Sequence, residues 1–377
     1  MTRKADSAIR LLHGTDGHKM ARTLLEAQDA ARLVPSGAPV ALKPNLVVAR
    51  PASGGATTHP EIVAGAIEYL LDAGVAARDI TIMEGAWVGD STRRAFEYCG
   101  YAALARRYGV GLVDLKGDET RAVDTPVGKI QVCVRALEAG FLLNLPVLKG
   151  HCQTVMTCAL KNLKGCLPDS EKRRFHTMGL HRPIAALAAV LRPALTLVDS
   201  LCGDPGFEEG GNPEVTNRMY IGEDPVALDV FGCDLLGIGP EEVPYIGMAA
   251  ALGVGSTTLD EGDVLEIGPD GKPLEAAEIR AGQSTTRRRH ADWRTLHPDL
   301  RIEEDQACSA CTASLAHALE KLAREGVDLS ALPTIRIGQG FAGHTPEGGI
   351  GIGRCAGGIG CPPSADSVEA LLRKGMA

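Results

Sequence analysis

Four cysteines near the C-terminal end of the chain have the residue type and spacing of a metal site. A Cys-x-x-Cys pair is followed by two single cysteines in a glycine-rich stretch, and the four residues are Cys308, Cys311, Cys355 and Cys361. Four thiolates are the ligand set of a structural zinc ion or of a [4Fe–4S] cluster. The glycines let the backbone approach the bound group, and the two prolines after the last cysteine fix the path of the chain.

The spacing within this motif favours iron and sulfide over zinc. A zinc ribbon has a second Cys-x-x-Cys pair, whereas five residues separate Cys355 from Cys361 and no histidine stands at zinc-finger spacing. We therefore predict a [4Fe–4S] cluster as the cofactor, held by all four cysteines. A zinc ion and a set of unligated thiols are the alternatives.

A second group of chemically capable residues lies between positions 149 and 182. In a chain of net charge -8, this stretch carries seven Lys and Arg against two Asp and Glu. Such an excess concentrates anions, so we expect a small anionic substrate, a phosphate or a carboxylate; a solvated basic surface is the alternative. Imidazole titrates near neutral pH and is suited to proton transfer. The candidate catalytic residues are His151, Lys161 and His176.

The expected substrate-binding side chains follow predicted strands or lie on the helix after them. Open α/β sheets bind their ligands at the carboxyl ends of the strands, which is where these residues are expected to gather. The candidates are Lys43, Asn45, His59, Lys149, Asn162 and Lys164. Lys161 and Lys164 are three residues apart and share one face of a helix. For Lys43, Asn45 and His59, a structural role in a turn or at a helix start is the alternative.

Alternating strands and helices are expected to position these residues. Ala38–Lys43 is predicted as a buried strand, Thr58–Glu61 has the pattern of a capping box at the start of a helix, and Asp79–Gly85 is the next strand. Strand, helix, strand is a βαβ unit, which builds a parallel sheet. Further along, Ala95–Tyr108 and Val155–Gly165 are both predicted as helices.

The pattern predicts a doubly wound, largely parallel α/β domain with a basic crevice over residues 1–280. A polar linker is expected at 281–300, followed by a small cysteine-rich, cluster-binding unit at 301–377. The glycine-rich loop Gly203–Asn212 lacks the G-x-G-x-x-G frame, and no Walker A motif occurs. A nicotinamide enzyme is therefore not supported.

Composition restricts the partners and the compartment. The net charge of -8 and the aromatic content of 4% argue against a nucleic-acid partner, and no apolar run is long enough to span a membrane. Eleven cysteines without a secretory signal predict a cytoplasmic protein with reduced thiols. The expected partners are the small anionic substrate and a redox partner protein, and a homo-oligomer stays open.

Six motifs in the first domain resemble the family called domain of unknown function 362. They are Lys43-Pro44-Asn45, Thr58-His59-Pro60, Lys149-Gly150-His151, Lys161-Asn162-Leu163-Lys164-Gly165, the strand ending at Asp199, and Asp224-Pro225-Val226-Ala227-Leu228-Asp229. The resemblance runs from about Ala38 to about Gly255. It implies a redox setting, because many members of that family carry iron–sulfur clusters. The βαβ start is also distantly similar to the nickel-pincer lactate racemase family.

The cysteine motif resembles a different family. Cys308-x-x-Cys311, Gly353-x-Cys355 and Gly360-Cys361-Pro362-Pro363 are similar to the proximal [4Fe–4S] site of nickel–iron hydrogenase small subunits and of the related complex I subunit. The resemblance covers the tail alone. It implies that these cysteines ligate a cluster.

The main functional hypothesis is an iron–sulfur oxidoreductase whose small anionic substrate binds in the α/β crevice. Four cysteine ligands suit electron transfer, because no iron is left open to substrate. One alternative is a cluster-dependent lyase or hydratase, in which one cysteine stands off and an iron acts as a Lewis acid. The others are a racemase-like enzyme of the α/β domain and a non-enzymatic electron carrier that docks through its basic crevice.

Overall fold

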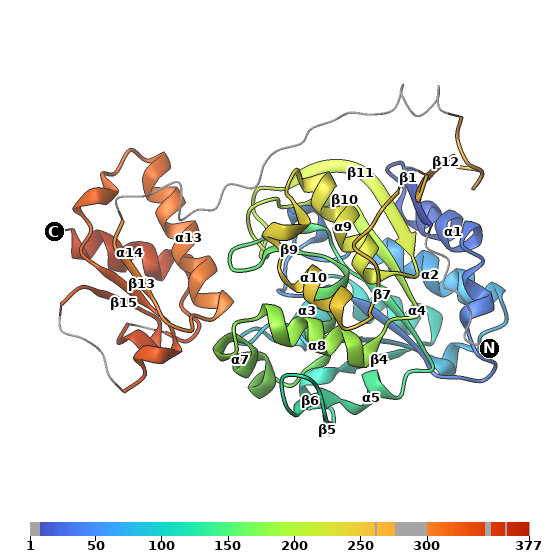
Figure 1. The fold of residues 1–377 in the computed structure, drawn as a ribbon, viewed down its shortest axis with the longest axis horizontal. Helices are drawn as coiled ribbons and strands as arrows, with labels where there is room; N and C mark the ends of the chain where they lie inside the picture. The colour runs from blue at the N-terminus through green and yellow to red at the C-terminus, as the bar shows by residue number, and fades with distance from the viewer. Residues whose placement is uncertain (1–7, 261, 276–299, 344–347, 359, 377) are drawn as a thin grey trace.

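An eight-stranded sheet forms the centre of the N-terminal part of the chain (Figure 1). The computed structural model describes residues 8–260, 262–275, 300–343, 348–358 and 360–376, so the predicted linker at 281–300 lies outside the described residues except for its last position. The strands stand in the order β12-β1-β11-β10-β7-β2-β3-β4. They are β1 (Ile9–His13), β2 (Val40–Pro44), β3 (Ile80–Glu84), β4 (Gly111–Asp114), β7 (Phe141–Leu145), β10 (Leu195–Gly203), β11 (Glu214–Gly222) and β12 (Val264–Ile267).

The sheet is largely parallel, which confirms the predicted fold class. Only β11 runs antiparallel to its two neighbours, β1 and β10, and the other five pairings are parallel. Helices connect the parallel strands, as in the unit β2–α2–β3. The helices of this part are α1 (Gly17–Ala27), α2 (Pro60–Asp72), α3 (Thr92–Tyr98), α4 (Tyr101–Tyr108), α5 (Val134–Leu137), α6 (Ala159–Asn162), α7 (Asp169–Thr177), α8 (His181–Leu191), α9 (Pro225–Leu236) and α10 (Tyr245–Ala251).

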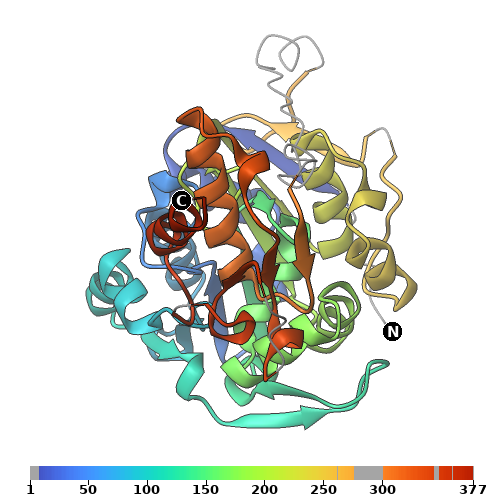
Figure 2. The same cartoon turned by 90° about the vertical axis from the view of Figure 1, so that its left-hand side faces the viewer.

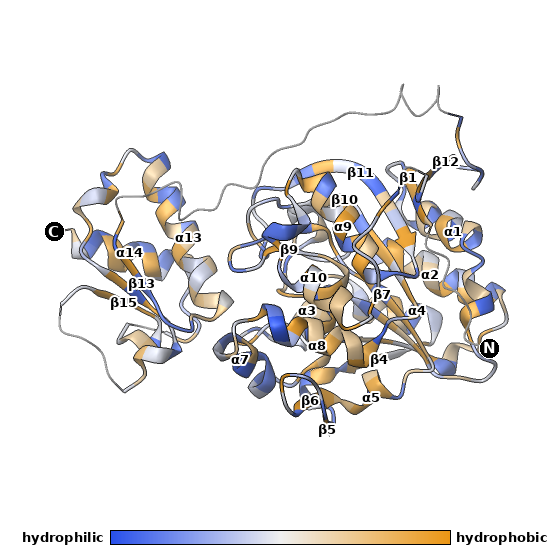
Figure 3. Cartoon of the chain, in the orientation of Figure 1, coloured by the Kyte–Doolittle hydropathy of each residue, from blue (hydrophilic) through white to orange (hydrophobic). Residues whose placement is uncertain are grey.

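Two hydrophobic cores, one on each face of the sheet, hold the helices in place. Side chains of a strand alternate between the faces, so Leu42 and Leu143 contribute to the core under α1 and α2. Ala41 and Leu142, one residue away, contribute to the core under α8, α9 and α10. The central strands β2 and β7 are accordingly buried throughout and mostly hydrophobic, with Lys43 and Asn144 as polar members, whereas α7 is hydrophilic along most of its length (Figure 3). Burial on both faces is what the continuous apolar runs of β2 and β7 require.

The direction of chain winding reverses beside β2. From β2 the chain moves to β3 and β4 on one side, and it later returns to place β7 on the other side of β2. In open α/β sheets a crevice forms at such a point, outside the carboxyl ends of the strands. Lys43 near the end of β2 and Glu84 at the end of β3 lie at this edge.

Three local predictions differ from the structure. Thr58 does not cap α2; its hydroxyl accepts a hydrogen bond from Asn45 N and donates to Leu145 O, and His59 occupies the cap position. The helix predicted at Ala95–Tyr108 is divided into α3 and α4, because Gly100 adopts a left-handed conformation with φ +84°. The stretch predicted as the helix Val155–Gly165 forms β9 (Val155–Thr157), the short α6 and a 3₁₀ turn at Leu163–Cys166.

Two small hairpins complete this part of the chain. One pairs β5 (Thr120–Val123) with β6 (Ile130–Cys133), and the other pairs β8 (Lys149–His151) with β9. No helix in the described ranges combines the length and the apolar character needed to cross a bilayer.

The C-terminal unit is a small α/β layer with its own core. Its parallel sheet has β14 (Ile335–Ile337) between β13 (Ile302–Glu304) and β15 (Ile350–Ile352), and α13 (Ser309–Arg324) and α14 (Ala365–Gly375) pack on it. Figure 1 shows the unit to one side of the main domain, and Figure 2 shows it in front of that domain. Specific contacts join them: Gln153 Nε2 donates to Ala307 O at 2.7 Å, and the rings of Phe207 and His317 stack with centroids 4.0 Å apart.

Candidate functional site

A pocket lies between the crevice of the α/β domain and the cysteine loops of the C-terminal unit. Its cavity of about 190 Å³ suits a small molecule. The α/β domain contributes Asn45, Glu84, Trp87, His151, Lys161, Asn162, Lys164, Lys172, Arg173, His176 and Glu208 to the lining, and the C-terminal unit contributes Cys308, Cys355 and Cys361. The structure therefore brings most of the predicted site residues of the two units to one cavity.

The four cysteines of the motif are close enough to influence one another electrostatically. Cys308 occupies the N-cap of α13 and Cys311 lies in its first turn, with Cys311 N donating to Cys308 O at 3.0 Å. A hydrogen bond from the Cys311 thiol, together with backbone N–H groups, lowers the pKa of Cys308 to about 6. The pKa of Cys311 is raised by its bond to Cys308, by burial, and by negative charge at Cys361 and Cys355.

This arrangement fits the donor set of a thiolate-held cluster. Cys311 is buried, Cys308 and Cys355 are half-buried, and Cys361 is exposed. Gly353 has φ +76°, and a Cβ there would stand 2.7 Å from Cys311 Sγ, so glycine is required where the loop passes this thiol. The lowered pKa of Cys308 favours metal binding by that thiol, because the thiolate is the ligand, whereas burial raises the pKa of Cys355.

Two lysines of the predicted anion site have donors directed into the pocket. Lys161 Nζ donates to Thr157 Oγ1 at 3.2 Å, and Lys164 Nζ lies 2.8 Å from His176 Nε2. Each ammonium has three N–H donors. Among the described residues, Thr157 is the hydrogen-bond partner of Lys161, and His176 is that of Lys164. Burial lowers the pKa of Lys161 to about 8, and burial with the charges of Lys161 and Lys172 lowers the pKa of Lys164 well below its ordinary value. A bound anion would raise the pKa of both lysines, because its negative charge favours their charged form.

The charge of Lys164 also reaches the cysteine motif. It is one of the causes that lower the pKa of Cys308, although a smaller one than the bond from Cys311. Lys161 and Lys164 thus line the same pocket as three of the four cysteines.

Asp229 positions the segment that carries Lys161 and Asn162. Its buried carboxylate accepts hydrogen bonds from Ala159 N at 2.6 Å and Leu160 N at 3.3 Å, at the start of α6. Burial raises the pKa of Asp229 to about 7 despite these bonds. Asp229 follows the α9 N-cap, Asp224, by one turn and a half of helix, so the Asp-Pro-x-x-x-Asp motif orders two helices at once.

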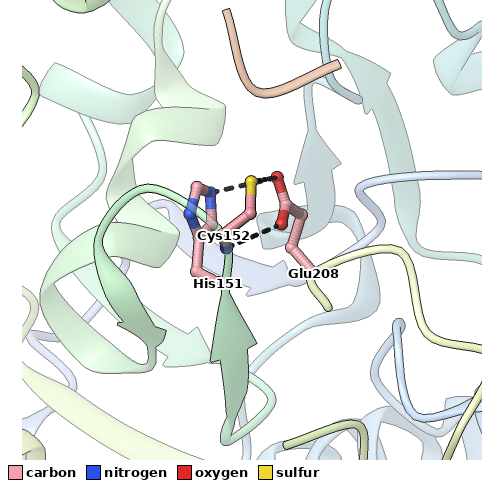
Figure 4. Close-up of side chains that lie close together, drawn as sticks. All are labelled: His151, Cys152 and Glu208. Carbon is pink, nitrogen blue, oxygen red and sulfur yellow. Dashed lines mark hydrogen bonds and ion pairs between the residues drawn. The ribbon is translucent and has the colours of Figure 1, made fainter. Parts of the chain in front are cut away.

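His151 is held beside Glu208 and Cys152 in a buried group (Figure 4). His151 Nε2 lies 3.3 Å from Glu208 Oε1, and Glu208 Oε2 accepts a hydrogen bond from Cys152 N at 3.3 Å. The Cys152 thiol donates to Glu208 Oε1 at 3.5 Å. The three ligand-type atoms lie within 4.8 Å of one another, which makes the group a geometric candidate for a metal ion.

The hydrogen bonds of His151 do not fit a metal ligand. Its Nδ1 accepts from the backbone N–H groups of Gln153 (3.0 Å) and Thr154 (3.3 Å), which assigns the proton of the neutral ring to Nε2. A histidine that binds metal through Nε2 instead donates its Nδ1–H to an acceptor. Burial, followed by the charges of Lys161 and Lys164, lowers the pKa of His151 well below its usual value. The same positive charges disfavour a cation at this place.

Three predicted substrate-binding residues lie outside the pocket lining. Lys43 is buried beneath it in an ion pair with Glu84. Lys149 is fully buried, and its ammonium donates to Asn45 Oδ1 (3.2 Å), Glu208 O (2.7 Å) and Ala56 O.

His59 is the third of these residues. Its Nδ1 lies 2.8 Å from Asp199 Oδ2. Burial opposes protonation of the ring, but the carboxylate of Asp199 raises the pKa of His59 overall. His59 thus contacts Asp199 in the middle of β10 rather than the pocket.

Several lining residues were not among the sequence candidates. Glu208 lies in the loop 203–212. The glycines of this loop suggested a nucleotide-binding motif, but they lack its spacing, and no other role was predicted for the loop. Lys172 donates to Gly85 O and Ala86 O, both at 2.9 Å, and so fixes the loop after β3. No spacing in the sequence links Glu208 to His151, because the two meet through tertiary packing.

The family comparison matches most of the α/β domain. The profile of the family described as Domain of unknown function (DUF362) matches residues 40–234, a range that contains His151, Lys161 and Glu208 and ends before the cysteine motif. The match confirms the family resemblance of the sequence motifs. The thylakoid-associated protein sll1697 of Synechocystis sp. is 27% identical over 247 residues, which are 63% of this chain and 76% of that protein.

A solved structure also resembles this chain. The lactate racemase apoprotein from Thermoanaerobacterium thermosaccharolyticum superposes with a TM-score of 0.40 at 15% identity, over 62% of this chain. This chain spans 58% of the racemase chain. Likeness at this level does not bear on activity.

Proposed function

Because this chain belongs to the DUF362 family, whose activity is open, we propose a function from the site itself: an iron–sulfur oxidoreductase that acts on a small anionic substrate. The observation that carries the proposal is the shared pocket. Cys308, Cys355 and Cys361 line the same cavity as Lys161 and Lys164. An electron carrier would need no such cavity beside its cofactor, so the arrangement supports an enzyme.

The proposed cofactor is a [4Fe–4S] cluster held by the four cysteines of the motif. When bound, such a cluster supplies one-electron transfer. The cysteine loops would place it at the wall of the pocket, because three of the four thiols belong to the lining. A redox partner protein would exchange electrons at the exposed Cys361, and reduced thiols are compatible with the cytoplasmic location expected from the sequence.

The chain's own residues would bind the substrate and handle protons. Lys161 and Lys164 offer free ammonium donors to a carboxylate or phosphate. His151 and His176 are the proton-transfer candidates, and both line the cavity. Apolar side chains of Val47, Trp87 and Val88 contribute to the lining and would exclude water, which strengthens electrostatic attraction.

A second candidate function rests on the exposure of Cys361. The other three cysteines are buried or half-buried, whereas Cys361 is exposed. If only three cysteines ligate, one iron is open to substrate and the protein is a lyase or hydratase rather than a redox enzyme. In the oxidoreductase Cys361 would ligate iron, whereas in the lyase or hydratase it would not.

Anaerobic purification followed by iron and sulfide analysis and EPR spectroscopy tests the proposal. We expect about four irons per chain, lost in Cys308→Ser and kept in the control Cys99→Ser, whose thiol hydrogen-bonds Arg50 O outside the pocket. Loss of the cluster in Cys361→Ser, or a retained cluster with an altered spectrum, supports the four-ligand redox enzyme, and a retained cluster with the wild-type spectrum supports the lyase. A colourless protein that holds one zinc would overturn both.

A further inference from the structure

We propose that a second cavity, between the α/β domain and the C-terminal unit, binds the carboxylate group of a small molecule that contacts both units. The cavity has a volume of about 640 Å³. The loops after β2, β3 and β10 line it from the α/β domain, and α13 and α14 line it from the C-terminal unit. This site is separate from the proposed active site, because none of the four motif cysteines, nor Lys161 or Lys164, belongs to its lining.

Two polar side chains of this second cavity lack a partner. Glu209 is only 7% exposed, and no hydrogen bond joins its buried Oε1 to another described residue. His317 reaches the cavity from α13, and its Nε2 is likewise buried without a partner within the described ranges. Buried polar atoms in folded proteins are nearly always hydrogen-bonded, so these two groups indicate a ligand that the site can still take.

Arg50 adds an available cation to the same cavity. Its Nη1 donates to Glu209 O at 3.1 Å and to Gly210 O at 3.3 Å, which fixes the guanidinium against the loop that carries Glu209. Its other donors, on Nε and Nη2, have no partner among the described residues. Burial is the main influence on the pKa of Glu209 and on that of His317, and the charge of Arg50 acts on both. The three side chains therefore lie within electrostatic reach of one cation.

The remaining basic side chains of the lining are already neutralised. Each forms an ion pair with a carboxylate that also lines the cavity, and the pairs are Arg94–Asp90, Lys321–Glu369 and Arg324–Glu320. Arg50 forms no ion pair within the part of the chain that the structure describes. It is thus the basic group of this cavity that a ligand can engage.

The protonation of the site selects an anion. Burial, followed by the charge of Glu208, raises the pKa of Glu209 to about 8, while Arg50 and Lys149 oppose this rise. Burial lowers the pKa of His317. Near neutral pH the Glu209 carboxyl therefore keeps its proton, the His317 ring is neutral, and the charge of Arg50 decides. A guanidinium beside a carboxylic acid O–H offers donors to both oxygens of a carboxylate.

A ligand at this place would favour the docked arrangement of the two units. Arg50 and Glu209 belong to the α/β domain, whereas His317 belongs to the C-terminal unit. A molecule that contacts both walls binds the docked chain more tightly than a chain whose units have separated. By linkage, its binding stabilises the docking.

NMR of the histidine ring signals of the full chain, with acetate as the probe, tests the site. The His317 signal is assigned by its loss in His317→Gln. We expect acetate at pH 7 to shift this signal to saturation in the wild type and equally in Lys161→Ala, and to slow hydrogen exchange in α13.

Two substitutions of Arg to Gln test the cation. Arg50→Gln should weaken acetate binding by roughly tenfold or more, because a charged donor is lost. Arg106→Gln, which removes an exposed charge on α4 outside the lining, is the matched control and should bind acetate like the wild type.

The dependence on pH tests the carboxyl group. As the pH rises through about 8, Glu209 ionises and repels the anion, so wild-type affinity for acetate should fall by up to about tenfold per pH unit. Glu209→Gln cannot ionise and should show no such fall.

Three results would overturn the inference. They are no saturable shift of the His317 signal with acetate, equal affinity in Arg50→Gln and wild type, and a saturable shift with methylammonium that is lost in Glu209→Gln, which would mark a cation site. A protein without iron can still give the expected acetate response, so the outcome is distinct from that of the proposed function.

Discussion

The ammonium group of Lys43 and the carboxylate of Glu84, which belongs to the pocket lining, form a buried ion pair. Lys43 Nζ also donates to Pro44 O at 3.0 Å and to Asn162 Oδ1 at 3.4 Å. Burial raises the pKa of Glu84, and the charge of Lys43 opposes that rise. A Cβ at Gly165 would collide with Glu84 Oε1. The pair thus connects the ends of β2 and β3 under the turn that carries Lys164.

Removing one partner of this pair should be strongly destabilising. Glu84→Gln leaves the Lys43 ammonium buried without a counter-charge, for which we expect a loss of about 3–5 kcal/mol in the free energy of unfolding. Urea denaturation measures the change. The control is Glu138→Gln, which breaks an exposed pair with Arg121 and should cost far less. Similar losses in the two variants would contradict a structural role for the buried pair.

Anion affinity should depend on Lys161 and on pH. Lys161→Ala removes a charged donor from the pocket, and we expect roughly tenfold weaker binding of phosphate by titration calorimetry. Because the pKa of Lys161 is about 8, wild-type affinity should fall as the pH rises through that value and the ammonium charge is lost. Lys129→Ala, at an exposed position away from the pocket, should bind like wild type. Unchanged affinity in Lys161→Ala would exclude this lysine from the anion site.

Glu209 should make stability decrease with rising pH. Burial, followed by the charge of Glu208, raises the pKa of Glu209 to about 8, and its Oε1 has no hydrogen-bond partner in the described structure. The folded state therefore retains a proton that the unfolded chain releases above about pH 4.3. The resulting loss of stability accumulates between that pH and about 8, where the folded-state carboxyl ionises.

Glu209→Gln should remove this slope. The variant should gain stability relative to wild type as the pH rises from 5 to 8, by at most about 1.4 kcal/mol per pH unit, and the difference should level off above 8. Thermal unfolding across this range measures it. A constant difference between the two proteins at all pH values would show that Glu209 is already ionised in the folded state.

The docking of the C-terminal unit should depend on Gly89. This residue has φ +105°, and a Cβ there would overlap Pro362 Cδ, next to Cys361. Gly89→Ala should push the cysteine loop away, so that hydrogen exchange in α13 becomes faster. Gly74→Ala is the matched control, because Gly74 has φ +89° but nothing within 4 Å of a Cβ. Equal exchange in the two variants would attribute the effect to backbone strain alone.

The repeating pattern of strands and helices was sufficient to predict the parallel sheet. The mostly apolar sequences of β2 and β7 are enough to predict buried strands, since a central strand is covered on both faces. Of the four cysteines selected by their spacing, Cys308, Cys355 and Cys361 line the C-terminal wall of the pocket. Both signals are contained within short segments.

What the sequence did not reveal depends on distant partners. Thr58 has the pattern of a helix cap, but Asn45 and Leu145 take both of its hydrogen bonds. The stretch after Val155 reads as one helix, yet Val155 has φ +64° and Asp229, far along the chain, starts α6 two residues after β9. Glu208 becomes a candidate only once its loop is folded onto β8. Each of these features is decided by tertiary contacts that override local preference.

The pocket has walls from both units of a single chain. Lys161 and Lys164 come from one unit and Cys308 and Cys355 from the other, so neither unit encloses the cavity alone. Covalent connection makes the meeting of these walls unimolecular, with an effective concentration set by the chain rather than by the amount of protein. Dilution therefore does not separate the basic wall from the cysteines, and the site should be as complete in a scarce protein as in an abundant one.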